Sequence, residues 1–541
     1  MSVRAHFVPL VSWVAVGLFA CSGEAPVSEA TPEGRPNILL IVADDLGYAD
    51  LGAYGGDIRT PNIDAIAGSG ILFTQFHTAP SCAPTRAMLL SGNNNHVAGM
   101  GRQSQYLEGV DGYEAHLSER VAPLPRLLRD AGYHTLTVGK WHLGMAPEHG
   151  PRAAGFTRGF NTRGGAANHF NAVGIRKTGS SYELDGEPAE WPEGRYSTDL
   201  YTERLLGFID DIDDGRPFFA FAAYTSPHWP LQVPDDELDR YAGQYDQGYD
   251  TLRVERFNSL KAAGILADNH ELPPRPESIP PWENLTAEEK RREARKMELY
   301  AAMVENLDDH VGRIVAHLEE KGILENTLIF FMGDNGPDGS NHYEEGQFSE
   351  FIQANYDNTY ENMGKSTSFV SYGFPWAEVS SAPFNRYKKY ATQGGVLAPM
   401  IVSGHGVVSR GTKSAAFTTV MDVAPSILEL AGVSYPDDGS VVPMLGESIL
   451  ALLGGTAERA HADDYLTVVS HSGRTFLRQG HWKLLHLESG FREEDFALYD
   501  LEADPGETTD LRDDRPEKMQ HMLELWRTHR KKLGILIPAD L

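Results

Sequence analysis

Four continuous apolar runs recur along the chain, and each is followed by charged or polar residues. The runs and the residues behind them are Ile38–Val42 before Asp44 and Asp45, Thr135–Val138 before Lys140 and His142, Phe218–Phe221 before His228, and Leu328–Met332 before Asp334 and Asn335. Apolar runs without polar alternation are typical of parallel strands buried on both faces of a sheet. Because ligands of open α/β sheets bind outside the carboxyl ends of the strands, we expect these polar residues to meet in one site.

Helix signals separate the apolar runs. Thr60 followed by Pro61 predicts a helix start, with Thr60 as the N-cap and Pro61 in the first helical position. Thr286 and Glu289 have the spacing of a capping box, and apolar residues then recur every three or four positions until an expected end near Gly322. The alternation of strands and helices predicts an α/β fold with a large mixed, mostly parallel sheet and helices on both faces.

Two further segments have different patterns. Residues 234–282 are polar and rich in proline, and they predict a surface excursion near the mouth of the site. From about Tyr435 the pattern changes to short alternating segments, such as Thr475–Arg478 and Trp482–His486. We expect a smaller C-terminal subdomain there, an antiparallel sheet closed by a helix at about residues 517–532.

The first residues have the pattern of an export signal. Arg4 precedes an apolar stretch, Phe7–Ala20, that is too short to span a bilayer. The segment ending at Cys21 resembles the lipobox of bacterial lipoproteins, in which the cysteine is lipidated and holds the protein at the membrane. Ordinary cleavage near Ala20 or Ala25 is the alternative. We therefore expect an exported protein, either a periplasmic or outer-membrane lipoprotein of a bacterium or a secreted protein.

These patterns divide the chain into four predicted parts. They are a signal peptide at 1–20, a flexible tether at 21–35, a catalytic domain at 36–434 and the C-terminal subdomain at 435–541.

Composition and charge narrow the classes of partner. The 541 residues are 41% hydrophobic and 23% charged, which fits a large globular unit. The formal net charge of -29 repels polyanions at long range, so we expect no nucleic-acid partner. A small anionic substrate would have to be held by a local cluster of positive charge.

The residues behind the first and last apolar runs are all oxygen donors. Asp44, Asp45, Asp334 and Asn335, if grouped, would form a site for a hard cation such as calcium or magnesium. Zinc favours nitrogen and sulfur ligands, so this set is poorly suited to zinc.

Cys82 is one of only two cysteines, and it begins the run Cys82-Ala83-Pro84-Thr85-Arg86, which continues to Leu90-Ser91-Gly92. Ser81 and Pro84 predict that Cys82 starts a helix, whose N-terminus would favour an anion. The run resembles the signature of the type I sulfatases, in which the cysteine is oxidised to formylglycine by a maturation enzyme. The aldehyde hydrate is then the nucleophile.

The resemblance implies roles for other residues. The block Gly139–Gly144 resembles the next sulfatase motif, which implies that Lys140 binds sulfate and that His142 is the partner of the hydrate. Arg86 would neutralise charge on the transferring group, and His228 would assist the leaving alcohol. A lysine near Gly394 and Gly395 would contact sulfate and the leaving group; its spacing favours Lys388, with Lys389 as the alternative.

The same family places its metal ligands in two pairs, which correspond to Asp44, Asp45, Asp334 and Asn335, with the modified Cys82 beside them. Related zinc phosphatases have an Asp-His pair where this chain has Asp334-Asn335, so the chain resembles sulfatases more closely. The resemblance implies an alkaline phosphatase-like fold and one Ca²⁺ per chain, with Mg²⁺ or Mn²⁺ as alternatives.

The resemblance is closest to bacterial arylsulfatases, which implies that the chain hydrolyses a small sulfate ester to an alcohol or phenol and sulfate. One alternative is a phosphonate or phosphate monoester hydrolase on the same scaffold. Another is a non-catalytic lipoprotein that binds sulfated glycans, but that reading would be expected to lack Cys82, a metal carboxylate or His142, and all are present.

Overall fold

The computed structural model describes residues 1–2, 34–103, 106–488, 490–537 and 540. Almost all of the predicted signal peptide and tether, including Cys21 with its predicted lipidation, lies outside these residues. No helix in the described part of the chain combines the length and the apolar character needed to cross a membrane.

A mixed sheet of ten strands forms the centre of the described structure, in the order β11-β2-β10-β9-β1-β8-β4-β5-β6-β7. The strands are β1 Asn37–Ala43, β2 Gly70–Phe73, β4 His134–Lys140, β5 Arg158–Thr162, β6 Tyr182–Leu184, β7 Glu187–Ala189, β8 Phe218–Ala223, β9 Thr327–Gly333, β10 Met400–Gly404 and β11 Thr412–Ser414. The four apolar runs form β9, β1, β8 and β4, which are adjacent and parallel. β10 and β6 are each antiparallel to both of their neighbours, so the sheet is mixed. β3 (Phe76–His77) and β12 (Thr418–Thr419) form a separate pair.

Helices cover both faces of the sheet, because alternate residues of β1 enter two different hydrophobic cores. Leu39 and Ile41 belong to one core, and Ile38 and Leu40 to the other. The helices of the first core are α1 Pro61–Gly68, α5 Ser197–Asp210, α6 Gly248–Ala262, α7 Ala287–Glu320 and α9 Gly373–Ser380. Those of the second are α2 Cys82–Ser91, α3 Leu124–Asp130, α4 Pro151–Ala154, α10 Gln393–Val396, α11 Val423–Ala431, α12 Leu450–Leu453 and α13 Pro516–Leu533. α8 (Ser349–Asn355) packs with a third, smaller cluster.

The predicted helix starts are present, and Thr60 occupies the predicted N-cap position of α1 without a side-chain capping bond. Thr286 and Glu289 form the predicted capping box of α7, which ends at Glu320. α1 begins at Pro61 as predicted, but the Thr60 side chain does not cap it. The Thr60 hydroxyl instead accepts a hydrogen bond from the Gly52 backbone at 2.9 Å, because the preceding loop folds back over it.

Many of residues 234–282 are exposed, as predicted for a surface excursion, but the segment is more ordered and more closely packed than the sequence indicates. This segment contains α6, and Tyr241, Tyr245 and Tyr249 are buried in the first core. Arg256 is buried with them because Asp50 neutralises it at 2.5 Å. Charged residues on the buried face of α6 hide its helical periodicity in the sequence.

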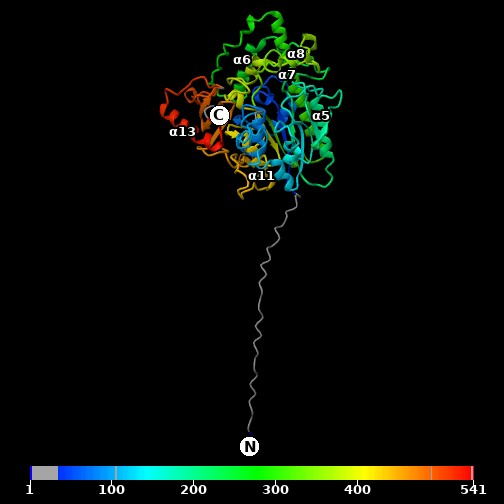
Figure 1. Cartoon of the computed structure of the whole chain (residues 1–541), viewed down its shortest axis with the longest axis vertical. Coiled ribbons are helices and arrows are strands. Elements are labelled where there is room, and N and C mark those ends of the chain that lie inside the picture. The colour runs from blue at the N-terminus through cyan, green and yellow to red at the C-terminus, as the bar shows by residue number, and fades with distance from the viewer. Residues whose placement is uncertain (3–33, 104–105, 489, 538–539, 541) are drawn as a thin grey trace.

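The C-terminal part has the predicted antiparallel sheet and helix. Its strands are β13 Leu466–His471, β14 Arg474–Gln479, β15 Trp482–His486 and β16 Ala497–Asp500. Figure 1 shows this part with α13 on one flank of the molecule and α5 on the other. The fold class is therefore as predicted. The boundary at residue 435 stays a prediction, because Phe476 and Trp526 share the second core with α2.

Candidate active site

The carboxyl ends of the parallel strands bring the predicted site residues together. β1 leads into Asp44 and Asp45, and β9 leads into Asp334. Backbone hydrogen bonds join the strand ends, from Asp44 to the Ser226 carbonyl at 3.0 Å and from Asp334 to the Ala43 carbonyl at 3.1 Å. The loops behind β1, β8 and β9 therefore meet at one edge of the sheet.

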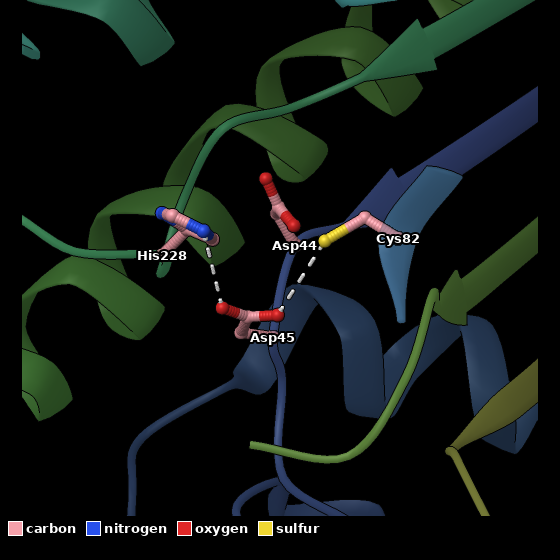
Figure 2. A group of neighbouring side chains, drawn as sticks. All are labelled: Asp44, Asp45, Cys82 and His228. Carbon is pink, nitrogen blue, oxygen red and sulfur yellow. Dashed lines mark hydrogen bonds and ion pairs between the residues drawn. The ribbon is translucent and has the colours of Figure 1, made fainter. Parts of the chain in front are cut away.

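Asp45 lies at the centre of this group. Its backbone is left-handed, with φ 65°, and its carboxylate accepts a hydrogen bond from Asn335 Nδ2 at 2.6 Å. Figure 2 shows the carboxylate between Cys82 and His228, with Asp44 beside it. Burial raises the pKa of Asp45 to about 8, against the opposing effect of Lys388. The carboxyl groups here are crowded enough to favour a bound cation.

Cys82 is the first residue of α2, as predicted, and it is fully buried. Its Sγ lies 4.0 Å from Asp45 Oδ1, and burial raises the pKa of the thiol. Ser81 occupies the N-cap position, but its hydroxyl donates to the Gln103 side chain rather than to the helix. The helix start thus directs residue 82 at the carboxylates.

Two lysines reach these carboxylates. Lys140 Nζ lies 2.6 Å from Asp44 Oδ2, and Lys388 Nζ lies 2.7 Å from Asp45 Oδ1. Lys389 Nζ instead contacts the Ser340 hydroxyl at 2.6 Å. Burial alone would lower the pKa of Lys388, but Asp45 beside it raises it well above its ordinary value. Lys388 is therefore charged.

Arg86 is fully buried and holds other site residues in place. Its Nη2 lies 3.0 Å from Asp334 Oδ2, and its Nη1 donates to the Lys140 carbonyl at 2.8 Å. These contacts give Arg86 the geometry of a support for a carboxylate and a lysine.

The two predicted histidines have different surroundings. His142 is half-buried with a left-handed backbone, φ 59°, and burial lowers its pKa well below the ordinary value. A Cβ at Gly165 would lie 2.3 Å from its ring, so any larger residue there would force the ring to move. His228 Nδ1 hydrogen-bonds the Trp229 carbonyl at 2.7 Å, which leaves Nε2 facing Asp45 at 3.4 Å. Burial lowers the pKa of His228 as well.

A family model described as Sulfatase matches residues 36–433 of the 541. The chain belongs to the sulfatase family. This confirms the resemblance seen in the sequence and makes the protein a sulfuric ester hydrolase. A second model, described as N-sulphoglucosamine sulphohydrolase, C-terminal, matches residues 386–532.

Relatives of this sulfatase include characterised and uncharacterised proteins. It is 39% identical over 436 residues to an arylsulfatase of Klebsiella aerogenes, covering 79% of this chain and 93% of the relative. It is 36% identical over 531 residues to an uncharacterized sulfatase of Schizosaccharomyces pombe, covering 94% and 95%. The sequence likeness therefore extends over almost the whole chain.

Solved structures share the fold of this sulfatase. The crystal structure of Ps i-CgsB has a TM-score of 0.66 at 24% identity and covers 91% of this chain and 92% of that chain. The phosphonate monoester hydrolase of Agrobacterium radiobacter has a TM-score of 0.56 at 19% identity and covers 92% and 96%.

The sulfatase family uses a divalent metal, and the residues present fit one. Asp44, Asp45, Cys82 and His228 each offer a ligand atom, and these atoms lie within 4.8 Å of one another. Asp44 Oδ1 and Asn335 Oδ1 are buried without a hydrogen-bond partner among the described residues. Buried oxygens without partners are costly, and a hard cation would satisfy both.

A cavity of about 530 Å³ opens beside this group. His142, His228 and Lys388 line it on the side of the carboxylates, and Trp229 and Phe348 add aromatic surface. None of residues 234–282 is among its described lining residues, and their expected place near the mouth stays a prediction.

Sequence reasoning missed Asp338, which also lines the cavity. Its Oδ2 lies 3.4 Å from Lys388 Nζ and accepts a hydrogen bond from Trp229 Nε1 at 2.9 Å. Its position in the sequence could have indicated a role, because Asp338 lies three residues after Asn335 in the same loop behind β9.

Proposed function

We propose that this sulfatase hydrolyses sulfate monoesters of the arylsulfatase type through a formylglycine hydrate made from Cys82. The observation that carries the proposal is the placement of Cys82, at the start of α2 and 4.0 Å from Asp45, within a group of carboxylates and lysines. The Klebsiella relative, an arylsulfatase, supports the aryl class of leaving group.

The modified residue supplies covalent chemistry. One hydroxyl of the hydrate loses its proton and attacks sulfur, and the S–O bond to the alcohol or phenol breaks as the leaving oxygen takes up a proton. Loss of a proton from the second hydroxyl then breaks the C–O bond to sulfate, which leaves as the aldehyde is restored, and water regenerates the hydrate. His142 accepts that proton, since its lowered pKa keeps the imidazole neutral. Lys140 and Lys388 stabilise negative charge on the transferring group.

Lys388 also assists the leaving oxygen, together with His228. The raised pKa of Lys388 keeps it protonated as a donor of hydrogen bonds. His228 is held by the Trp229 carbonyl at Nδ1, which leaves Nε2 available on the cavity side. Arg86 supports this arrangement through Asp334 and Lys140.

We propose that the bound metal is one Ca²⁺, with Mg²⁺ or Mn²⁺ as alternatives. Asp44, Asp45, Asp334, Asn335 and the oxygen of modified residue 82 would hold it, and oxygen donors favour a hard cation. When bound, the cation would polarise the sulfate oxygens.

The export and partner predictions are retained as proposals. We propose that the protein is an exported bacterial enzyme, held at the membrane by lipidated Cys21 or released after ordinary cleavage. Its partners are a small sulfate ester and, during maturation, a formylglycine-generating enzyme. The non-catalytic glycan-binding reading is not proposed, because the chain is a sulfuric ester hydrolase.

The second candidate function is hydrolysis of phosphonate or phosphate monoesters, supported by the fold shared with a phosphonate monoester hydrolase. The test compares kcat/KM for 4-nitrophenyl sulfate, 4-nitrophenyl phosphate and a phenylphosphonate monoester. We expect the sulfate to be preferred. A large preference for either phosphorus ester would overturn the proposal.

A further inference from the structure

Asp338 contacts both a charged and an aromatic residue of the cavity lining, Lys388 and Trp229. Its carboxylate oxygen Oδ2 contacts both Lys388 Nζ, at 3.4 Å, and Trp229 Nε1, at 2.9 Å. Its other oxygen, Oδ1, accepts hydrogen bonds from the Ser340 backbone at 2.9 Å and hydroxyl at 2.6 Å. Asp338 is 4% exposed, so both oxygens are used inside the protein. One carboxylate thus fixes two groups that face the same cavity.

Lys388 has two carboxylate partners, and only one of them is a candidate metal ligand. Asp45 is one of the residues that would hold the cation through their oxygens. A cation bound to the Asp45 carboxylate would therefore weaken the attraction between Asp45 and Lys388. Asp338 is not one of the residues that would hold the cation. With a cation bound, Asp338 would therefore remain available to orient Lys388.

Trp229 contributes aromatic surface to the cavity wall beside His228. Its ring lies 4.2 Å from the His228 ring, centroid to centroid, and 4.6 Å from that of His342. Aromatic surface of this kind packs against a flat leaving group. The hydrogen bond from Nε1 to Asp338 fixes the rotation of the indole within the wall.

We propose that Asp338 is a positioning residue that holds the side chains of Lys388 and Trp229 in fixed positions relative to each other. Lys388 can then contact the oxygen of the leaving group while Trp229 packs against its ring. The inference rests on the proposed function. Because Asp338 acts through Lys388, its removal harms esters with poor leaving groups most, since these depend most on charge stabilisation at the departing oxygen.

The test measures kcat/KM for a series of aryl sulfates from 4-nitrophenyl sulfate to phenyl sulfate. For Asp338→Asn we expect a loss of about 10- to 100-fold with phenyl sulfate and of less than about 5-fold with 4-nitrophenyl sulfate. Trp229→Phe keeps a ring but removes the N–H donor, so it should show the same trend with smaller losses. If Asp338→Asn does not fold, Trp229→Phe carries the test alone.

Asp357→Asn is the matched control. Asp357 makes the same turn, accepting hydrogen bonds from the Thr359 backbone at 2.9 Å and hydroxyl at 3.1 Å, but it is exposed and outside the cavity. We expect no change in this variant. Aldehyde and metal contents are measured in every variant and should equal those of the wild type.

An equal loss for all leaving groups, no loss at all, or a fall in aldehyde or metal content would each overturn the role of Asp338. These outcomes leave the proposed function standing. Failure of the mature wild-type enzyme to hydrolyse any sulfate ester would overturn the proposed function, and this inference with it.

Discussion

Lys388 and Lys389 are neighbours in the sequence, but their side chains contact different residues. Both Lys388 and Lys389 line the cavity, but only Lys388 reaches Asp45, at 2.7 Å. Lys389 has a left-handed backbone, φ 75°, and its Nζ is directed to the Ser340 hydroxyl. The structure thus favours Lys388 by geometry, where the sequence left both open.

We expect Lys388→Met to lower kcat/KM for 4-nitrophenyl sulfate by about 100- to 1000-fold, because it removes a charged contact to the transferring group. Lys389→Met is the matched control and should cost less than about 10-fold. The measurement is kcat/KM of the two variants, from steady-state kinetics on protein preparations with equal aldehyde content. A larger loss in Lys389→Met would assign the role to the other lysine.

The residues that the sequence predicted best are those placed by a strand end. Asp44 and Asp334 follow buried strands, so the sheet alone brings them to one edge. Asp338 and Gly165 could not be predicted in this way. Asp338 acts through contacts with residues distant in the sequence, and Gly165 matters only because the ring of His142 packs against it.

Among the elements, α6 and α7 support the loop behind β1. Arg256 of α6 pairs with Asp50 at 2.5 Å, and Tyr300 of α7 donates a hydrogen bond to the same aspartate at 2.6 Å. Asp50 in turn accepts a hydrogen bond from the Gly47 backbone at 2.8 Å. This network fixes the turn that follows Asp45.

Arg256→Met should lower the free energy of unfolding by about 3–5 kcal/mol, because it leaves buried Asp50 without its cation. Chemical denaturation measures the change. Arg527→Met is the control of the same type, since Arg527 pairs with Glu493 at the surface, and it should cost less than about 1 kcal/mol. Equal effects in the two variants would contradict the role given to α6.

A second prediction concerns Glu378 of α9, whose pKa burial raises from 4.5 to about 7, although Arg253 opposes the shift. An acid that binds its proton more tightly when folded loses stability as the pH rises between these values. Glu378→Gln removes this loss, which is about 3 kcal/mol. The variant should therefore gain Tm relative to the wild type at pH 8 but not at pH 4.5. The same difference in Tm between the variant and the wild type at both pH values would contradict the raised pKa of Glu378.

The helices also show which elements local sequence can predict. The start of α7 was predictable because Thr286 and Glu289 cap it by themselves. α6 was missed because Arg253 and Arg256 lie on its buried face, where their charges break the apolar pattern. Their burial depends on distant partners, which periodicity does not reveal.

At the scale of the whole molecule, the C-terminal sheet contacts the loop that contains Lys388 and Lys389. Arg474 of β14 donates to the Lys389 carbonyl at 3.0 Å, and Glu507 accepts from the Gln393 backbone at 2.7 Å. The C-terminal part and the large sheet therefore share both a core and the support of the site.

A cation held by the residues behind β1 and β9 and at the start of α2 would connect these elements, so its removal should destabilise the whole fold. At a free Ca²⁺ concentration 100 times Kd, binding adds about 2.7 kcal/mol of stability. Prolonged chelation should lower both Tm and activity, and added Ca²⁺ should restore both. Full activity and an unchanged Tm after complete metal removal would count against the site.

The mass of the tryptic peptide from Thr60 to Arg86 tests the central claim most directly, using protein from a host that contains the maturation enzyme. We expect an aldehyde or its hydrate at position 82. An intact thiol in enzyme that hydrolyses sulfate esters would contradict the formylglycine mechanism.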